Sequence, residues 1–538
     1  MYADDTDIGD ASSVTGATVD SNRDPGWLAL FSNGNAAVSV MLTGGVAIHA
    51  LSLRVVATVL PSVVPEIGGL RYFAWATTVA VVSAIWGAAF AAPLARSRGL
   101  RGAYRISLVL FIAGSITCAA APDMGVFLAG RLFQGLGGGL LVALAYTTIQ
   151  RVFPAGLRTR AMVLVPGIWG VAALCGPLLG GALAEWGFWR WAFWIDVPVA
   201  AVVAILAECS LPRSAEMDAT GVVAQARATI GRLALLGASV IAVAIGGVSG
   251  GALSGGLGLV VGVALLMALL RMEQTADAGV VVFRLLPTGA YRAGNVLGAA
   301  SLALALMMGG STAIIYLPYV AVATGGFSPI IGGYLSAIAS LTWTAAAMGS
   351  ASAAGNSAER SMISGPALLA LGLFLTGCGL IIGSFAIMAL SVGLLGAGIG
   401  TAWAHLGNLM IAHAKQNEGD VASAFISTNQ MISQAFASAL AGMIANFAGF
   451  ADPALGSIGV VRGVTWLFLA FTLVAAAAVP LSVIAVRLSA ARAPTRLLAN
   501  TAVLPQGGGV RLKLRTRGKT ISSPLPALPR KIPRTQET

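Results

Sequence analysis

The sequence predicts an all-α polytopic membrane protein with about fourteen spans, and three observations support this. Of the 538 residues, 57% are hydrophobic and only 10% are charged. A soluble chain carries about 25% charged residues to hydrate its surface. Apolar runs long enough to cross a bilayer recur along the chain, and basic residues concentrate in alternate loops. We therefore expect lipid to cover most of the surface.

The predicted spans follow from runs of roughly 20 apolar residues, the length that crosses the hydrocarbon core as a helix. They cover residues 37–61, 73–95, 103–121, 126–149, 161–183, 190–211, 230–250, 251–271, 291–321, 331–353, 361–384, 385–410, 419–447 and 463–486. The pair 230–271 is continuous and Gly-rich, so its boundaries are the least defined. A count of twelve spans would still leave both ends of the chain on one side.

The charges of the loops set the expected orientation. Fifteen basic residues fall in the loops after even-numbered spans or at the adjoining helix ends: Arg96, Arg98, Arg101, Arg105, Arg151, Arg158, Arg160, Arg213, Arg227, Arg232, Arg271, Arg284, Arg292, Arg360 and Lys415. The opposite loops hold only Arg71, Arg190 and Arg462. Loops rich in Lys and Arg stay in the cytoplasm. We expect a multi-pass protein of the cell inner (cytoplasmic) membrane with both termini in the cytoplasm.

Both ends of the chain are polar and are expected to be disordered cytoplasmic tails. Residues 1–36 carry six Asp and lack the basic start of a cleaved signal peptide. Residues 487–538 are rich in Pro and carry eleven Lys or Arg against one acid, which accounts for most of the net charge of +12. Basic residues beside a membrane meet anionic lipid first. We therefore expect membrane lipid, and not nucleic acid, as the partner of this tail.

The four cysteines lie in or at the ends of apolar runs, without a CxxC pair or a His at ligand spacing. They are interpreted as small buried hydrophobic residues. We expect no bound metal, no cofactor and no disulfide framework. A GxxxxGK[ST] loop and an HExxH motif are both absent from the sequence, which disfavours an ATP-driven pump and an intramembrane hydrolase. The chain is not expected to be an enzyme.

Three segments carry chemistry beyond hydropathy. Gly130–Gly139 (GRLFQGLGGG) resembles the RxxQGxGgg signature of the major facilitator superfamily. Gly167–Gly181, with Gly170, Gly176, Pro177 and Gly180, is similar to the antiporter motif of its exporters. Trp189–Pro198 (WRWAFWIDVP) resembles the WRWxFxINxP stretch of the fourteen-span drug:proton antiporter family. The resemblance covers residues 45–210 well and the second half mainly by its span pattern.

This resemblance implies a major-facilitator fold with two six-helix bundles, at 37–211 and 291–486, joined by a linker with two extra spans at 212–290. It implies a monomeric secondary transporter that moves a small organic solute by alternating access. The implied direction is export of drug-like compounds coupled to protons. An importer of an organic nutrient or vitamin on the same fold is the alternative, and a membrane sensor without transport is an alternative of another class.

The sequence departs from the family in span 1. The family has an acid there before a run ending in Ala-Leu-Pro, whereas Ser52 takes its place here and Arg54 adds a cation. Arg96 stands at or beside the Asp of the loop after span 2. Arg131 is the other cation at membrane depth, and its glycine-rich helix allows it to reach a cavity or, alternatively, to bind backbone carbonyls structurally.

Proton carriers must therefore be sought elsewhere. A carboxylate within a membrane is a functional candidate, and imidazole titrates near neutral pH. The candidates are Asp196, Glu208, His49 and His405. Asp196 lies near the start of its span and has an interfacial alternative, while each His has a packing alternative.

Polar and aromatic residues inside spans are candidates for lining the substrate path. They are Gln134, Trp169, Asn408, Asn429, Gln430 and Gln434, with Trp86, Tyr146, Tyr316, Trp343 and Trp403. Three amides in the single span 419–447 require partners, which favours this span. The alternative is packing for the amides and interfacial anchoring for the aromatic residues. The span 5 motif likewise has the alternative of a Gly-rich packing seam.

Overall fold

A computed structural model describes residues 27–32, 35–212, 220–249, 251–275, 286–323, 327–415 and 418–501, with a strand pair at 515–516 and 519–520. The chain divides into two compact units, 1–488 and 489–538. The first is helical in its described part, and the second holds the end of one helix and the antiparallel pair β1 (Arg515–Thr516) and β2 (Lys519–Thr520). The predicted disorder of residues 1–26 and of most of 502–538 lies outside the described residues.

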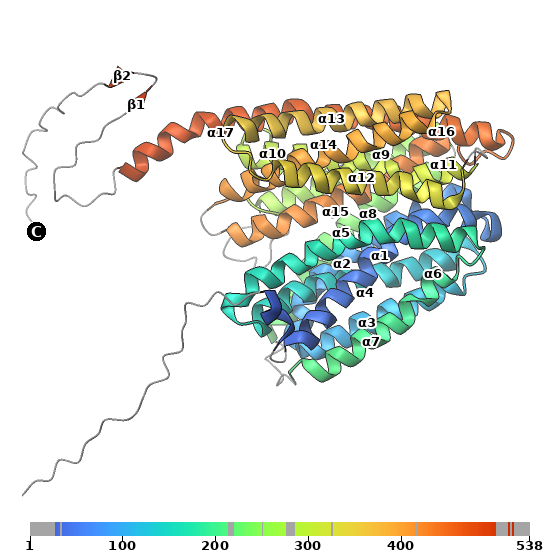
Figure 1. Cartoon of the computed structure of the whole chain (residues 1–538), viewed down its shortest axis with the longest axis horizontal. Helices are drawn as coiled ribbons and strands as arrows, with labels where there is room; N and C mark the ends of the chain where they lie inside the picture. The colour runs from blue at the N-terminus through green and yellow to red at the C-terminus, as the bar shows by residue number, and fades with distance from the viewer. Residues whose placement is uncertain are drawn as a thin grey trace, which may run out of the picture. The chain divides into compact units, whose positions relative to one another are not determined.

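The first half of the chain forms a bundle of six spans, coloured blue to green in Figure 1. Its helices are η1 (Trp27–Phe31), α1 (Asn35–Ile67), η2 (Leu70–Tyr72), α2 (Trp75–Ser97), α3 (Gly99–Ala119), α4 (Met124–Val152), α5 (Ala155–Glu185), α6 (Trp191–Trp194) and α7 (Asp196–Ser210). The short α6 and α7 make one span together.

Two linker helices and a second bundle follow. They are α8 (Thr220–Val248), α9 (Ala252–Thr275), α10 (Val296–Gly310), η3 (Ser311–Tyr316), α11 (Leu317–Ala323), α12 (Pro329–Ser350), α13 (Asn356–Ile382), α14 (Phe385–Ala412), α15 (Gly419–Phe447), α16 (Gly456–Ala476) and α17 (Ala478–Thr501). α10 to α11 form one span, and so do α16 and the first part of α17.

Thirteen helical segments of the described chain are long and apolar enough to cross a membrane. The fourteenth predicted span is α15, which is 29 residues long but does not reach the same apolarity. Asn429, Gln430 and Gln434 interrupt its apolar sequence. The doubtful pair 230–271 is two separate helices, because α8 ends at Val248 and α9 begins at Ala252.

The structure corrects the predicted tail boundaries at both ends. Residues 27–31, expected to be disordered, form η1, and Leu30 is fully buried while its carbonyl accepts a hydrogen bond from Ser39 Oγ at 2.7 Å. At the other end α17 continues to Thr501, beyond the predicted limit at 486. Ala, Leu and Arg dominate residues 487–501, and these are strong helix formers.

Glycines bring α4 into close contact with its neighbours. A Cβ at Gly135 or Gly139 would overlap the carbonyls of Ala80 and Ala84 on α2, and one at Gly137 would stand 2.5 Å from the Ser107 carbonyl of α3. Small residues at these positions let the helix backbones touch, which is the main source of packing energy between helices in lipid. This close packing fixes the face of α4 that carries Arg131.

The linker hairpin of α8 and α9 contacts both bundles. Trp86 Nε1 on α2 donates to the Leu233 carbonyl of α8 at 3.0 Å. Asn446 Nδ2 on α15 donates to the Gly247 carbonyl of α8 at 3.2 Å. Trp86, a predicted candidate for lining the substrate path, thus contacts the linker through its indole nitrogen.

Candidate functional site

A buried polar network occupies the N-terminal bundle around Arg131, whose side chain is 1% exposed. Arg131 Nη1 donates to Gln134 Oε1 at 2.6 Å and to Ser52 Oγ of α1 at 3.0 Å. Its Nε donates to the Ala76 carbonyl of α2 at 3.2 Å. The guanidinium thus joins α1, α2 and α4. One of its three acceptors is a backbone carbonyl, as the structural alternative predicted, and access to a cavity stays a prediction.

Gln134 extends the network to a carboxylate. Its Nε2 donates to Ser115 Oγ of α3 at 2.8 Å and lies 3.3 Å from Asp196 Oδ2 at the start of α7. Asp196 is 8% exposed, so the protein itself encloses the carboxylate. One amide therefore separates a buried cation from a buried anion. Such an arrangement balances the two charges, because leaving either charge alone in the interior costs about 3–5 kcal/mol.

His49 lies beside this network on α1 and is 2% exposed. A Cβ at Gly138 would overlap its Nδ1, so this glycine makes room for the imidazole. The ring meets the edge of Trp169 with 6.1 Å between centroids. Within the described part of the chain His49 Nε2 has no hydrogen-bond partner, which is a costly state for a buried polar atom.

The span 5 motif forms the seam between the two bundles. Gly167, Gly170, Pro177 and Gly181 lie on one face of α5, at spacings of three, seven and four residues. A Cβ at Gly333 of α12 would stand 2.7 Å from the Pro177 carbonyl, and one at Gly181 would stand 2.9 Å from Ile330 Cα. No described atom lies within 4 Å of a Cβ built at Gly167 or Gly170.

The two bundles therefore touch along one half of α5 and are parted along its other half. Figure 1 shows α5 and α12 where the blue–green and yellow–red halves meet. Leu174, between the two halves on the same face, remains 46% exposed. The contacts of the span 5 motif fit the predicted alternative of a Gly-rich packing seam. The half of α5 without contacts leaves room for the two bundles to approach each other.

Aromatic residues close the touching end. Phe73, in the turn between α1 and α2, contacts Tyr316, Tyr319 and Phe450 with centroid distances of 5.0, 5.1 and 5.8 Å. Phe73, Tyr316 and Phe450 are each 1% exposed. Ser438 Oγ of α15 also donates to the Ala74 carbonyl at 3.2 Å. Tyr316, predicted as a lining residue, therefore belongs to this closure.

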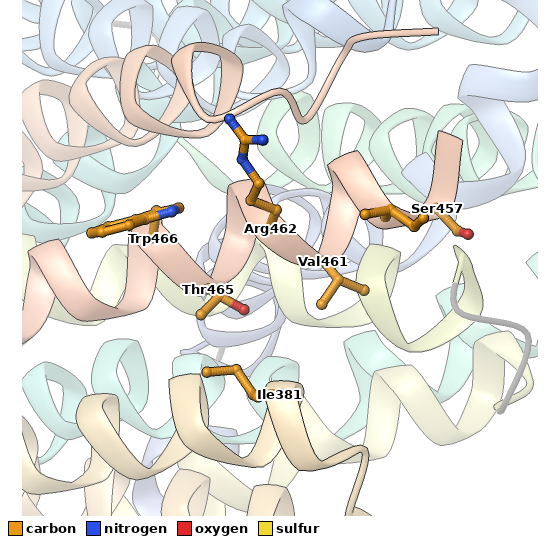
Figure 2. Close-up of a pocket in the computed structure, with 7 residues that line it drawn as sticks. Ile381, Ser457, Val461, Arg462, Thr465 and Trp466 are labelled. Atoms are coloured by element: carbon orange, nitrogen blue, oxygen red, sulfur yellow. The ribbon is translucent and has the colours of Figure 1, made fainter. Parts of the chain in front are cut away.

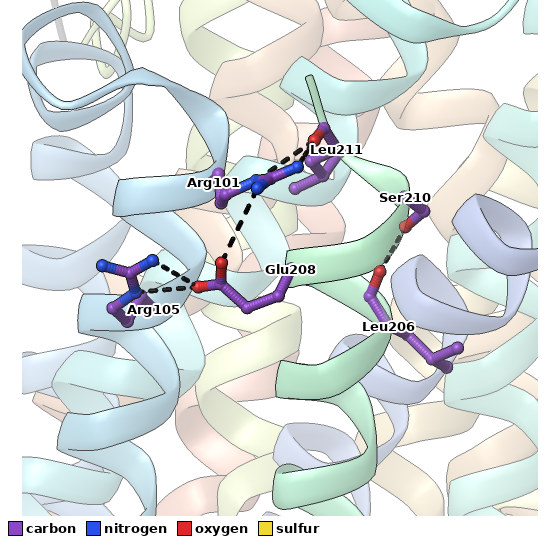
Figure 3. Close-up of polar contacts among 6 residues, drawn as sticks. All are labelled: Arg101, Arg105, Leu206, Glu208, Ser210 and Leu211. Atoms are coloured by element: carbon purple, nitrogen blue, oxygen red, sulfur yellow. Dashed lines mark hydrogen bonds and ion pairs between the residues drawn. The ribbon is translucent and has the colours of Figure 1, made fainter. Parts of the chain in front are cut away.

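Glu208 lies apart from the network, at the end of α7. It forms ion pairs with Arg105 at 2.7 Å and Arg101 at 3.9 Å, and Arg101 also donates to the Leu211 carbonyl (Figure 3). The Glu208 side chain is 39% exposed. These contacts tie α3 to the end of α7. His405 on α14 is also separate, and its Nε2 lies 3.0 Å from the Ser350 carbonyl.

The amides of α15 divide into two kinds. Asn429 is fully buried, with its Nδ2 donating to the Ser301 carbonyl at 3.1 Å and its Oδ1 accepting from the Tyr291 hydroxyl. Burial raises the pKa of the Tyr291 phenol above its usual range, so this group stays protonated as the donor. Gln430 and Gln434 are half-buried, while Asn408 on α14 is exposed. Asn429 is thus held by structural contacts.

Figure 2 draws a pocket of about 520 Å³ between α13 and α16, lined by Ile381, Ser457, Ile458, Val461, Arg462, Thr465 and Trp466. Ile381, Ile458 and Trp466 are 67%, 72% and 58% exposed. This pocket is on the outside of the second bundle and contains none of the predicted site residues.

Sequence reasoning missed three parts of the site. Ser115 is a polar residue within a span, which indicates that it needs a polar partner but does not identify Gln134 as that partner. Gly333 has no motif around it, so its contact with Pro177 required the fold. The aromatic closure joins residues from distant turns, and no local pattern indicates it.

This fold and seam define a transporter class. The sequence profile of the Major Facilitator Superfamily matches residues 42–438, and the chain belongs to this superfamily. A probable multidrug-efflux transporter of Mycobacterium tuberculosis (strain H37Rv) is 32% identical over 449 residues, covering 82% of this chain and 92% of that protein. Multidrug resistance protein 3 of Bacillus subtilis is 30% identical over 158 residues, covering 29% and 31%.

Solved structures support the same fold. The D-xylose–proton symporter aligns with a TM-score of 0.56 and 16% identity, covering 82% of this chain and 97% of that chain. A POT family transporter in complex with a thioalcohol-conjugated peptide aligns with a TM-score of 0.59 and 15% identity, covering 85% and 97%. At this identity the likeness concerns the fold alone.

Proposed function

We propose that this chain exports organic solutes from the cytoplasm in exchange for protons, with Asp196 as the proton-binding group. The observation that carries the proposal is the buried chain of contacts from Asp196 through Gln134 to Arg131. Export of drug-like compounds is supported by the relatives named as multidrug transporters. The excess of Lys and Arg in alternate loops supports a cytoplasmic membrane location with both termini inside.

The network gives protonation a mechanical consequence. With Asp196 charged, the carboxylate accepts from Gln134 Nε2 and balances the charge of Arg131. With Asp196 protonated, the same buried region carries the net charge of Arg131 alone, and the preferred positions of Gln134 and Ser52 change. Because Ser52 is on α1 and α1 packs along α5, this change reaches the seam with α12. Proton binding thereby biases the bundles toward one of two arrangements.

His49 is a second candidate for the proton path, since it is buried next to the network with a free nitrogen in the described structure. Glu208 and His405 are less suited, because each is engaged elsewhere and neither contacts Arg131 or Gln134.

The experiment is solute transport by proteoliposomes with an imposed pH gradient. We expect Asp196→Asn to abolish gradient-driven accumulation of a substrate while sparing its downhill exchange. Glu208→Gln, a carboxylate outside the network, is the matched control and should leave accumulation unchanged apart from a few-fold effect of expression. Normal accumulation by Asp196→Asn would exclude Asp196 as the coupling group, and insensitivity of the native protein to a protonophore would exclude proton coupling.

A further inference from the structure

We infer that Arg54 is an anion-binding group at the seam between the bundles, so that the transported solute carries a carboxylate or a similar anionic group. The inference names a substrate class for the proposed transporter, and its binding arm is independent of that proposal. No contact described above assigns a role to this side chain.

Arg54 lies deep within α1, 19 residues after its first residue and 13 before its last. A Cβ at Gly176 of α5 would stand 2.5 Å from Arg54 Cβ. The next residue of α5, Pro177, contacts Gly333 of α12. Arg54 therefore stands where α1 passes the seam, and it is half-buried there.

Arg54 points away from the Asp196 network. Ser52, which contacts Arg131, is two residues earlier, and two residues correspond to about 200° around a helix. The Asp196 carboxylate lies beyond Ser52, Arg131 and Gln134 on the other side of α1. The Asp196 carboxylate is thus engaged in the network and does not pair with Arg54.

Among the described residues Arg54 has no hydrogen-bond or ion-pair partner. Other cations of the same bundle are held: Arg131 by three acceptors, Arg105 by Glu208, and Arg190 by Glu66. A guanidinium at membrane depth without a partner is costly, and such a group marks a ligand path. None of its nitrogens is a fully enclosed unpaired atom, so the charge remains reachable from the seam.

The facing bundle cannot neutralise this charge. The sequence contains no Asp or Glu in residues 286–358, 361–417 or 421–451, which include α10, α11, α12, α14 and nearly all of α13 and α15. Its acids, Glu359, Glu418, Asp420 and Asp452, stand at helix ends or in a turn. Rocking of the bundles therefore brings no carboxylate of the second bundle to Arg54, and the counter-ion must come from the solute.

The chemistry of guanidinium selects the ligand. Its planar fork donates two parallel hydrogen bonds to a carboxylate, and charge-assisted bonds are about twice as strong as neutral ones. A bound anion would also remove the charge that opposes closing of the apolar seam. The seam therefore favours an amphipathic organic anion over the neutral or cationic form of the same molecule.

The test uses 2-naphthoate, its near-isosteric neutral amide 2-naphthamide, and the 2-naphthylmethylammonium cation. Binding is measured by fluorescence titration of the full-length protein in nanodiscs, with empty nanodiscs as the baseline. The native protein should bind 2-naphthoate at least about tenfold more tightly than the amide. Arg54→Gln should reduce the ratio of 2-naphthoate affinity to 2-naphthamide affinity to about one without changing the affinity for the amide. Arg54→Glu should bind the 2-naphthylmethylammonium cation more tightly than 2-naphthoate. Arg105→Gln, an exposed arginine, should keep the native ratio.

Transport of the radiolabelled probes distinguishes the two proposals. Anion-selective binding that depends on Arg54, without transport of any probe, supports the anion site and counts against the exporter. A native ratio near one, an unchanged ratio in Arg54→Gln, or no binding of 2-naphthoate overturns the anion site, whether or not transport occurs. Arg54→Lys provides a folded variant that retains the charge, and it should keep part of the preference.

Discussion

Gln134 forms hydrogen bonds with both Arg131 and Asp196, with its carbonyl oxygen 2.6 Å from Arg131 Nη1 and its amide nitrogen 3.3 Å from Asp196 Oδ2. The amide therefore orients two side chains of opposite charge that it links by hydrogen bonds. Its two ends have opposite hydrogen-bonding character, which suits a residue placed between a donor and an acceptor.

Replacing Gln134 tests this bridging role. Gln134→Leu removes both hydrogen bonds and leaves two buried charges without their shared partner, so we expect lower thermal stability and loss of pH-gradient-driven transport. Gln134→Asn keeps the amide on a shorter side chain and should retain part of the thermal stability and part of the pH-gradient-driven transport. Melting temperature in detergent and proteoliposome uptake measure the two effects. Native coupling in Gln134→Leu would contradict the bridge.

Arg131 and Asp196 should depend on each other for folding. Arg131→Met leaves Asp196 buried without a cation, and we expect reduced membrane abundance, because removing one member of a buried pair of charges costs about 3–5 kcal/mol. The double variant Arg131→Met with Asp196→Asn should recover abundance and remain unable to couple transport to protons. Quantitative immunoblots and a double-mutant cycle provide the measurement, and additive losses would show that the two charges act independently.

The seam between α5 and α12 should not tolerate bulk at Gly333. A Cβ there would stand 2.7 Å from the Pro177 carbonyl, so Gly333→Leu should separate the bundles at the Phe73 end and reduce transport at least about tenfold at matched abundance. Gly349→Leu on the same helix is the control, since no described atom lies within 4 Å of its Cβ. Equal activity of the two variants would mean that the seam does not limit the cycle.

The basic segment after Thr501 should be dispensable for transport. Residues 489–538 form a separate compact unit, and the sequence after Thr501 has no apolar run that could span. Truncation after Thr501 should leave transport within a few-fold of the full chain at matched expression. A complete loss at normal abundance would reveal a function for this basic segment.

The fold could be predicted from the sequence because a membrane requires apolar helices of about 20 residues and an excess of Lys and Arg in the cytoplasmic loops. Arg131, Gln134 and Asp196 were each proposed as candidates, but their joining was not, since they come from different turns of α4 and the start of α7. Ser52 stands where the family has an acid, and in the structure its hydroxyl accepts a hydrogen bond from Arg131. The carboxylate of this region is Asp196, which comes from α7. The contacts of Trp86 and Tyr316 could not be predicted, because an aromatic residue within a span has the same local sequence pattern at a linker contact, at a closure or on a substrate path.

The most direct test of the central claim is proton release on substrate binding. A saturating substrate is added to purified protein in weakly buffered solution, and a pH indicator records the protons displaced. If Asp196 exchanges its proton for solute, the native protein and Glu208→Gln should release protons in equal amount, and Asp196→Asn should release none while still binding substrate. Release from Asp196→Asn equal to that of the native protein would contradict the account.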